Sequence, residues 1–183
     1  MDFTTVIKTR RSVRAYADKP IPEDVLGRVL EAGRLAPSAC NFQPWRFIVV
    51  KDAATRGQIA KMAGQQQFVA KAPVVIVCCG KRYAQKYNWI GENLYLVDLG
   101  IAVEHLALAA RNEGLGTCWI GSFQDQPIKK LLGVPADHDV VMLLPMGYPV
   151  SADQFSATTE RLGIEQVVFA EKFGGPGAGR ASC

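Results

Sequence analysis

A long apolar run at residues 89–112 limits the possible folds of this chain more than any other feature. Its only helix breakers are two glycines, and apolar residues recur at helical spacing, as at Leu94, Val97 and Ile101. Leu99 occupies another side of the same helix, so apolar residues face most directions. A helix of this kind must be buried, either in the centre of the protein or in a subunit interface. In a chain of 183 residues, a large permanent interface explains the pattern better.

Shorter elements surround this helix, and helices alternate with strands along the chain. The segment PVVIVCC at residues 73–79 is a continuous apolar run, typical of a strand that is buried on both faces. Further strands are expected at residues 46–50, 115–123 and 140–149, and further helices at residues 2–9, 22–33, 54–63, 127–132 and 161–169. No repeat or linker interrupts this order, so we expect one three-layered domain of the α/β or α+β class.

The composition excludes several classes of protein. Hydrophobic residues make up 49% of the chain and charged residues 21%, which is typical of a globular protein. The net charge of +4 is too small to indicate nucleic-acid binding. Apolar stretches fall short of the roughly 20 residues of a membrane span, and the N-terminus reaches Arg10 before any signal-like segment. The five cysteines follow no metal-binding spacing, so we expect a cytoplasmic protein without a metal site or a membrane or nucleic-acid partner.

A compact basic segment, Arg10-Arg11-Ser12-Val13-Arg14, follows the first expected helix. Guanidinium groups pair with phosphate oxygens through two parallel hydrogen bonds, and the Ser12 hydroxyl can donate another. An anion-binding site and a solvated basic patch explain this segment about equally well. The glycine patterns of Rossmann and P-loop phosphate sites do not occur in the chain. Any phosphate that these arginines bind is therefore held in a different way.

Four motifs in a particular order carry a resemblance to a known family. They are RRSVRAY at residues 10–16, LAPSACNFQPWRF at 35–47, GLGTCWIGSF at 114–123 and MGYP at 146–149. Each motif is weak alone, but the PSxxNxQPW loop together with an upstream RxSxR pattern is specific. The chain resembles the compact members of the FMN-dependent nitroreductase family over residues 3 to 169.

The resemblance implies an α+β fold of the nitroreductase type. This fold has three layers, α/β/α, around a central mixed sheet. Two chains interlock as a homodimer through the long helix and a swapped C-terminal segment, with the flavin at the subunit boundary. Residues 1–170 would form a single FMN-binding domain, and residues 171–183 a flexible C-terminal tail.

The resemblance also assigns the residues that would hold the phosphate end of FMN. Arg10, Ser12 and Arg14 would bind the phosphate and the ribityl hydroxyls. Arg11 would reach the ribityl chain or the ring, and Arg161 would close the phosphate pocket.

Other residues would surround the flavin ring. A loop from the partner subunit would cover it, with the residues Pro37, Ser38, Ala39 and Asn41. Gln65 would hydrogen-bond the flavin, although Gln66 and Gln67 are alternatives for this role. Ile120 and Gly121 would offer backbone groups near the ring.

The implied activity is that of an NAD(P)H-dependent flavin oxidoreductase. FMN would accept hydride at N5 from NADH or NADPH and then reduce a nitroaromatic, quinone or enone-type acceptor, in a ping-pong mechanism. No catalytic side chain is needed, since the chemistry takes place on the flavin. Two alternatives stay open: a relative that cleaves its own reduced FMN, and a flavin-binding module without turnover. The sequence does not distinguish NADH from NADPH, nor does it identify the physiological acceptor.

Overall fold

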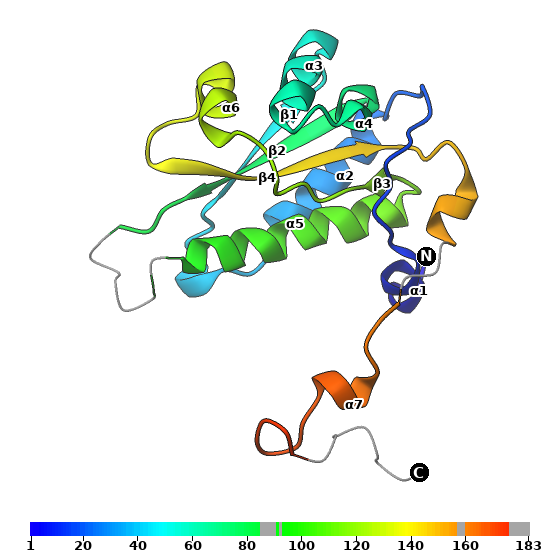
Figure 1. Cartoon of the computed structure of the whole chain (residues 1–183), viewed down its shortest axis with the longest axis vertical. Helices are drawn as coiled ribbons and strands as arrows, with labels where there is room; N and C mark the ends of the chain where they lie inside the picture. The colour runs from blue at the N-terminus through cyan, green and yellow to red at the C-terminus, as the bar shows by residue number, and fades with distance from the viewer. Residues whose placement is uncertain (85–90, 92, 157–159, 176–183) are drawn as a thin grey trace.

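The structure is a computed structural model that describes residues 1–84, 91, 93–156 and 160–175 (Figure 1). Its α-helices are α1 (Phe3–Thr9), α2 (Glu23–Arg34), α3 (Ala53–Met62), α4 (Gln67–Lys71), α5 (Leu94–Asn112), α6 (Asp125–Leu132) and α7 (Ile164–Val167). Its strands are β1 (Trp45–Val50), β2 (Val74–Lys81), β3 (Gly116–Thr117) and β4 (His138–Gly147). Short 3-10 helices lie at Ala39–Asn41 and Ala152–Phe155.

The strands form a sheet in the order β1-β2-β4-β3. In the described part of the chain, the neighbouring strands are all antiparallel, and the one parallel pairing is a bridge between Ser12 and Thr117. The central strand β2 is buried from Val74 to Gly80, because helices cover both faces of the sheet. The prediction of a strand buried on both faces is confirmed.

Two hydrophobic cores lie on opposite sides of the sheet. On one side, Ile76 and Cys78 of β2 pack with residues of α2 and α5 such as Val29 and Leu106. On the other side, Val75 and Val77 pack with residues of α3, α4 and α6, namely Ile59, Val69 and Ile128. The alternation follows from the two-residue period of a strand. The predicted α+β fold with three layers is confirmed (Figure 1).

The long helix is shorter than predicted and buries one side only. It begins at Leu94, and residues 89, 90 and 92 of the predicted helix lie outside the described part. Leu99 and Leu106 are buried, but Val97 and Ile101 are 56% and 36% exposed. The single chain therefore leaves an apolar side of α5 uncovered. Among the described residues, none of the helices has the length and apolar character that crossing a bilayer requires.

The predicted strand at residues 115–123 is too long. Regular pairing with β4 stops after Thr117, and only an isolated bridge joins Ile120 to Leu143. Between them, Cys118 donates its N–H to the carbonyl of Pro145 at 3.4 Å. A full antiparallel pair needs a second hydrogen bond in return, and proline has no N–H to donate. Pro145 therefore interrupts the ladder.

The predicted helix at residues 161–169 is reduced to α7, which covers Ile164–Val167. Figure 1 shows α7 extending away from the three layers, and Ile164 and Val167 of α7 are exposed in the described part of the chain. Short helices depend on packing against other elements, because isolated helices below about 12 residues are marginal in water. The helix α4 was not predicted, and residues 176–183 of the predicted tail lie outside the described part.

Candidate functional site

The basic segment lies beside β3, where its register decides which side chains face outward. The Val13 N–H donates to the Thr117 carbonyl at 2.9 Å, and the Val13 side chain is buried. In extended backbone, alternate residues point to the same side. Ser12 and Arg14 are exposed on the side opposite Val13, and Arg10 has the same parity. The segment therefore presents Arg10, Ser12 and Arg14 together.

The Cys118 thiol lies next to Ser12 and within the electrostatic influence of Arg14 and Arg10. Burial raises the pKa of this thiol, while the positive charge of Arg14, a hydrogen bond with Ser12 and the charge of Arg10 oppose the increase. Each of the three therefore lies close enough to act on the same sulfur atom. Two guanidinium groups and a hydroxyl on one side of the segment form a set of donors suited to an oxyanion.

Arg10 also has a carboxylate partner on α5. Its Nε lies 3.4 Å from Oε1 of Glu104. Burial raises the pKa of Glu104, and the charges of Arg10 and His105 offset part of that increase. Glu104 thus holds Arg10 in place and neutralises part of its charge.

A hollow lined by basic residues adjoins this segment. It has a volume of about 320 Å³ and is lined by Ile7, Lys8, Arg11 and Arg161. Arg11 donates to the carbonyls of Lys8 and Arg10, at 2.7 and 2.8 Å. The structure therefore brings the late basic residue Arg161 to the N-terminal arginines, although they are 150 positions apart in sequence. Of the charged residues described around this hollow, all are cationic.

The predicted ring-side residues lie on neighbouring segments. The Gln124 N–H donates to the Met62 carbonyl at 2.9 Å, which ties the turn after Gly121 to the end of α3. Gln65 follows Met62 closely and is exposed, with a positive φ of 59°. The cluster that contains Val13 includes Phe68 of α4, so this region also adjoins the basic segment.

The turn at residues 119–121 combines free space beside Gly121 with one unpaired, buried donor. A Cβ added at Gly121 would meet no atom within 4 Å, so the backbone there is open to a ligand. Ile120 is buried beneath it. Trp119 Nε1 is the one buried side-chain nitrogen or oxygen of the described residues that lacks a hydrogen-bond partner. Buried donors are nearly always paired, so an unpaired one is informative next to an open backbone.

The loop at residues 37–43 has an unusual backbone. Cys40, Asn41 and Gln43 have positive φ values of 46°, 56° and 50°, a region that residues other than glycine adopt at a cost. Hydrogen bonds hold this conformation. The Gln43 N–H donates to the Ser38 hydroxyl at 2.9 Å, and the Ala39 N–H donates to Asp98 at 3.1 Å.

Asp98 is a residue that the sequence reasoning missed. It lies on α5, is 4% exposed and accepts hydrogen bonds from the Ala39 N–H and the Tyr83 hydroxyl. Burial and this hydrogen bond to Asp98 raise the pKa of Tyr83. One signal was present, since Asp98 is a single acidic residue between Val97 and Leu99 in an otherwise apolar part of the helix.

Within one chain, the loop and the arginines are held at different places on α5. Asp98 anchors the loop, while Glu104 contacts Arg10. Six residues of α-helix correspond to about 9 Å along the axis and about 120° around it. The structure thus brings together the N-terminal arginines, and Gln65 lies three positions before Phe68, which packs in the cluster of Val13. It puts Pro37, Ser38, Ala39 and Asn41 on another side of the helix.

Comparison with known proteins identifies the family. The nitroreductase family model matches residues 7–86 and 58–148, which is most of the chain. This chain belongs to the nitroreductase family. One relative, an NADH dehydrogenase of Thermus thermophilus, is 31% identical to this chain, and the match covers 92% of this chain and 95% of the relative. An FMN reductase [NAD(P)H] of Bacillus subtilis is 32% identical, with 89% and 71% covered.

A solved structure agrees with this assignment. The NADPH:FMN oxidoreductase from Vibrio harveyi, complexed with NAD⁺, superposes with a TM-score of 0.81 at 26% identity. The match covers 93% of this chain and 77% of the Vibrio chain. The resemblance inferred from the four motifs is therefore confirmed.

Proposed function

We propose that this nitroreductase binds FMN through its N-terminal arginines and transfers electrons from NADH or NADPH to a nitroaromatic, quinone or enone-type acceptor. The observation that carries the proposal is that Arg10, Ser12 and Arg14 share one side of the extended segment beside β3. Relatives named FMN reductase [NAD(P)H] and NADPH:FMN oxidoreductase support both the cofactor and the hydride donor. The chain is an NAD(P)H-dependent oxidoreductase by family.

The residues present fit FMN. Guanidinium groups and a hydroxyl suit a terminal monophosphate dianion, and Arg11 and Arg161 add charge in the neighbouring hollow. At the ring end, the open backbone at Gly121 leaves room for a polar ligand. Glu104 would hold Arg10 ready and share it with the phosphate.

These contacts indicate which parts of the reaction depend on the protein and which on bound FMN. Bound FMN supplies the centre that accepts and returns hydride. The protein's share is to fix the phosphate through Arg10, Ser12 and Arg14, to orient the ring beside Ile120 and Gly121, and to leave one face accessible. Since hydride donor and acceptor then use one open face in turn, a ping-pong mechanism follows, and no side chain has to act as acid or base.

We propose that the site is shared in a homodimer. Val97 and Ile101 form an uncovered apolar side of α5, and the segment that contains α7 extends away from the layers (Figure 1). That segment exposes large apolar side chains, namely Leu162, Ile164, Val167 and Phe173. Exposed apolar surface of this extent is typical of a permanent interface. In such a dimer, a loop on another side of α5 would cover the partner's flavin, with residues 1–170 as the domain and 171–183 as the tail.

The cysteines support a reducing location. Cys40, Cys78, Cys79 and Cys118 are all free thiols. Burial raises the pKa of Cys79 to about 11, so this thiol is largely protonated and inert. We therefore place the protein in the cytoplasm.

The decisive experiment is flavin analysis of the purified protein. Extraction and chromatography should give one FMN per chain, and FAD or no flavin would overturn the proposal. The flavin absorbance should bleach with NADH or NADPH and return with a nitroaromatic or a quinone. Loss of the flavin itself during turnover would indicate the flavin-cleaving alternative, and absence of bleaching the non-catalytic one.

The role of the basic segment is tested with Arg14→Ala. Loss of one charge-assisted contact to phosphate costs about 1.5–3 kcal/mol, which lowers FMN affinity about ten- to hundred-fold. Arg34→Ala is the matched control, because Arg34 pairs with Glu31 on the surface of α2. Equal FMN affinity in the two variants would remove Arg14 from the site.

The shared site is tested with mixed dimers of Arg14→Ala and Asn41→Ala. If each flavin uses Arg14 of one chain and Asn41 of the other, one site of a mixed dimer carries both changes and the other carries none. About half of the normal activity per dimer should then return. Mixed dimers that stay inactive, or a monomer with full activity, would show that each chain builds its own site.

A further inference from the structure

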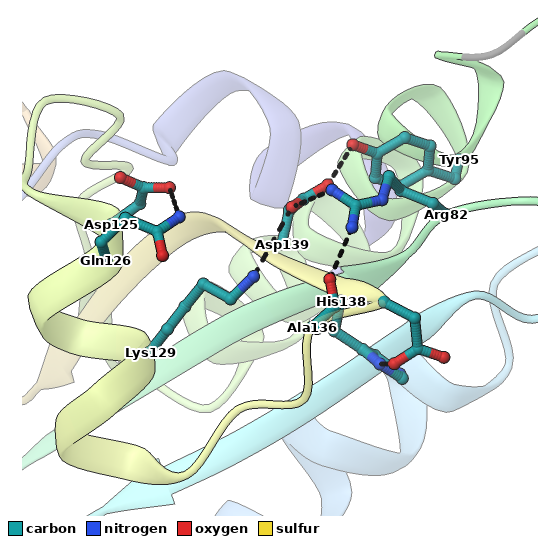
Figure 2. Close-up of polar contacts among 9 residues, drawn as sticks. Arg82, Tyr95, Asp125, Gln126, Lys129, Ala136, His138 and Asp139 are labelled. Atoms are coloured by element: carbon teal, nitrogen blue, oxygen red, sulfur yellow. Dashed lines mark hydrogen bonds and ion pairs between the residues drawn. The ribbon is translucent and has the colours of Figure 1, made fainter.

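A second polar cavity lies between α6 and the ends of β2 and β4 (Figure 2). Its volume is about 640 Å³, and Arg82, Lys129, Lys130 and Asp139 are its charged lining residues. Arg82 follows β2, the two lysines lie on α6, and Asp139 belongs to β4. None of the residues assigned to FMN lines it.

A network of hydrogen bonds fixes one wall of this cavity. Arg82 lies 2.9 Å from Asp139 and donates to the Ala136 carbonyl at 2.5 Å. From the other side, the Tyr95 hydroxyl donates to Asp139 at 2.7 Å (Figure 2). The guanidinium group of Arg82 is therefore held in one orientation, so a ligand would not have to order it.

Lys129 carries an ammonium group with unused donors. Its side chain is only 11% exposed, and Figure 2 shows it reaching from α6 toward Asp139. The distance from Nζ to the Asp139 carboxylate is 3.9 Å, which is too long for a hydrogen bond. In the described part of the chain, Nζ has no acceptor within hydrogen-bond distance. The stem of Lys129 is mostly covered while its ammonium group stays accessible from the cavity, so its hydrogen-bond donors are available to an anion there.

The charges of the cavity do not balance. Three cations face one carboxylate, and Asp139 is already shared by Arg82, Lys129 and Tyr95. The nearby Asp137 does not line the cavity and pairs with Lys81 and His138 instead. For Lys130, the described residues include no ion-pair partner. The cavity thus has a surplus of two positive charges.

We propose that this cavity is a binding site for a small phosphorylated molecule, separate from the FMN site. The phosphate group would accept hydrogen bonds from Lys129 and Lys130 beside the fixed guanidinium group of Arg82. Cavities of about 300–1,000 Å³ hold small organic ligands, so this one has room for more than the phosphate group itself. The uncharged remainder of the lining consists of Gln126, Gly133, Val134 and Ala136, which suits a neutral, polar body attached to the phosphate.

Calorimetric titration of the FMN-loaded protein tests the proposal, because bound FMN occupies the arginines of the first site. The probes are ribose 5-phosphate, inorganic phosphate and ribose, at about 0.15 M salt to screen non-specific attraction. We expect saturable binding of the phosphates, one per chain, and none of ribose. Tighter binding of ribose 5-phosphate would identify a phosphate monoester as the ligand, and equal binding would identify free phosphate.

Variants link the binding to the cavity. Lys129→Gln with Lys130→Gln should weaken binding about ten-fold or more, and the exposed Lys130→Gln alone about three-fold. Lys61→Gln is the matched control, since it removes one exposed charge at the end of α3. If the double variant does not fold, Lys130→Gln still decides the test against Lys61→Gln. Binding that is absent up to about 10 mM, or equal in Lys130→Gln and Lys61→Gln, would overturn the proposal.

Discussion

Replacing Asp98 by alanine tests how the loop at residues 37–43 keeps its shape. The Asp98 carboxylate is buried on α5 and accepts hydrogen bonds from the Ala39 N–H and the Tyr83 hydroxyl. The alanine variant loses both bonds, while three loop residues must still adopt positive φ. We therefore expect a loss of stability and a more mobile loop.

The size of the loss follows from the two bonds. A hydrogen bond to a charged acceptor contributes about 1.5–3 kcal/mol. Both donors are half-buried, so water regains part of this free energy, and the variant also avoids the desolvation of the carboxylate. We expect a net loss of about 2–3 kcal/mol in the free energy of unfolding. For a chain of this size, that lowers the melting temperature by about 4–12 °C.

Thermal unfolding of the FMN-loaded protein measures this effect, and Tyr83→Phe is the matched control. The phenylalanine keeps its ring against Phe42, where the ring centroids are 5.1 Å apart, and removes only the hydroxyl. It should cost about half as much as Asp98→Ala, and should cost nothing further when added to it. Faster hydrogen exchange at the Ala39 amide should accompany Asp98→Ala but not Tyr83→Phe.

The opposite result is easy to recognise. If Asp98→Ala melts within about 2 °C of the unchanged protein, the buried carboxylate does not hold the loop. If Tyr83→Phe costs as much as Asp98→Ala, the stabilising bond is the one to Tyr83, and the Ala39 contact contributes nothing.

Two further predictions concern the basic segment. Burial raises the pKa of Glu104, so the folded state binds the proton of this carboxyl group more tightly than the unfolded state does. The free energy of unfolding therefore falls as pH rises above 4.5. Because glutamine carries no charge, Glu104→Gln should raise the melting temperature near pH 7 and leave it unchanged near pH 4. A lower melting temperature at pH 7 would mean that the ion pair with Arg10 outweighs burial. Gly116→Ala would place a Cβ 2.5 Å from Val13, so it should lower the free energy of unfolding by about 1–3 kcal/mol and weaken FMN retention. The control Gly57→Ala places its Cβ in open space on α3 and should not destabilise the protein.

The fold was readable from the sequence where burial alone decides the structure. The run from Val74 to Cys79 is apolar and rich in β-branched residues, which is typical of a strand with cover on both faces, and β2 is an inner strand of the sheet. The helix α2 likewise begins directly after Pro22 with two acidic residues in its first turn, as the residue preferences at the start of a helix predict. In both cases the signal lies within the segment itself.

The errors arise where a distant residue decides the outcome. The strand at residues 115–123 has the composition of a strand, but Pro145 lies opposite Cys118 and cannot return its hydrogen bond. That pairing is known only once the register of β3 and β4 is known. The last predicted helix is shortened for a related reason, because Leu162, Ile164 and Val167 stay exposed in the part of the chain that the structure describes.

The sites show the same division between local and long-range information. The arginines at 10, 11 and 14 are adjacent in sequence, so their anion-binding character was visible there, and the motif order led to the family. The cavity between α6, β2 and β4 could not be predicted from the sequence, because Arg82, Lys129 and Asp139 lie on three separate segments. Their meeting depends on a bulge in β4, where Cys78 pairs with Met142 but Cys79 pairs with Val140.

This bulge decides which acidic residue reaches the cavity. Because Val141 has no partner residue on β2, Gly80 pairs with Asp139, and Arg82 lies within hydrogen-bond distance of that carboxylate. Without the extra residue, Gly80 would face Val140, and Asp139 would shift by one position along β2. Because side chains alternate between the two faces of a strand, that shift would also turn Asp139 to the opposite face of the sheet relative to its neighbours on β2. The orientation of Arg82, and with it the fixed wall of the cavity, therefore depends on one inserted residue in a strand whose composition gives no sign of it.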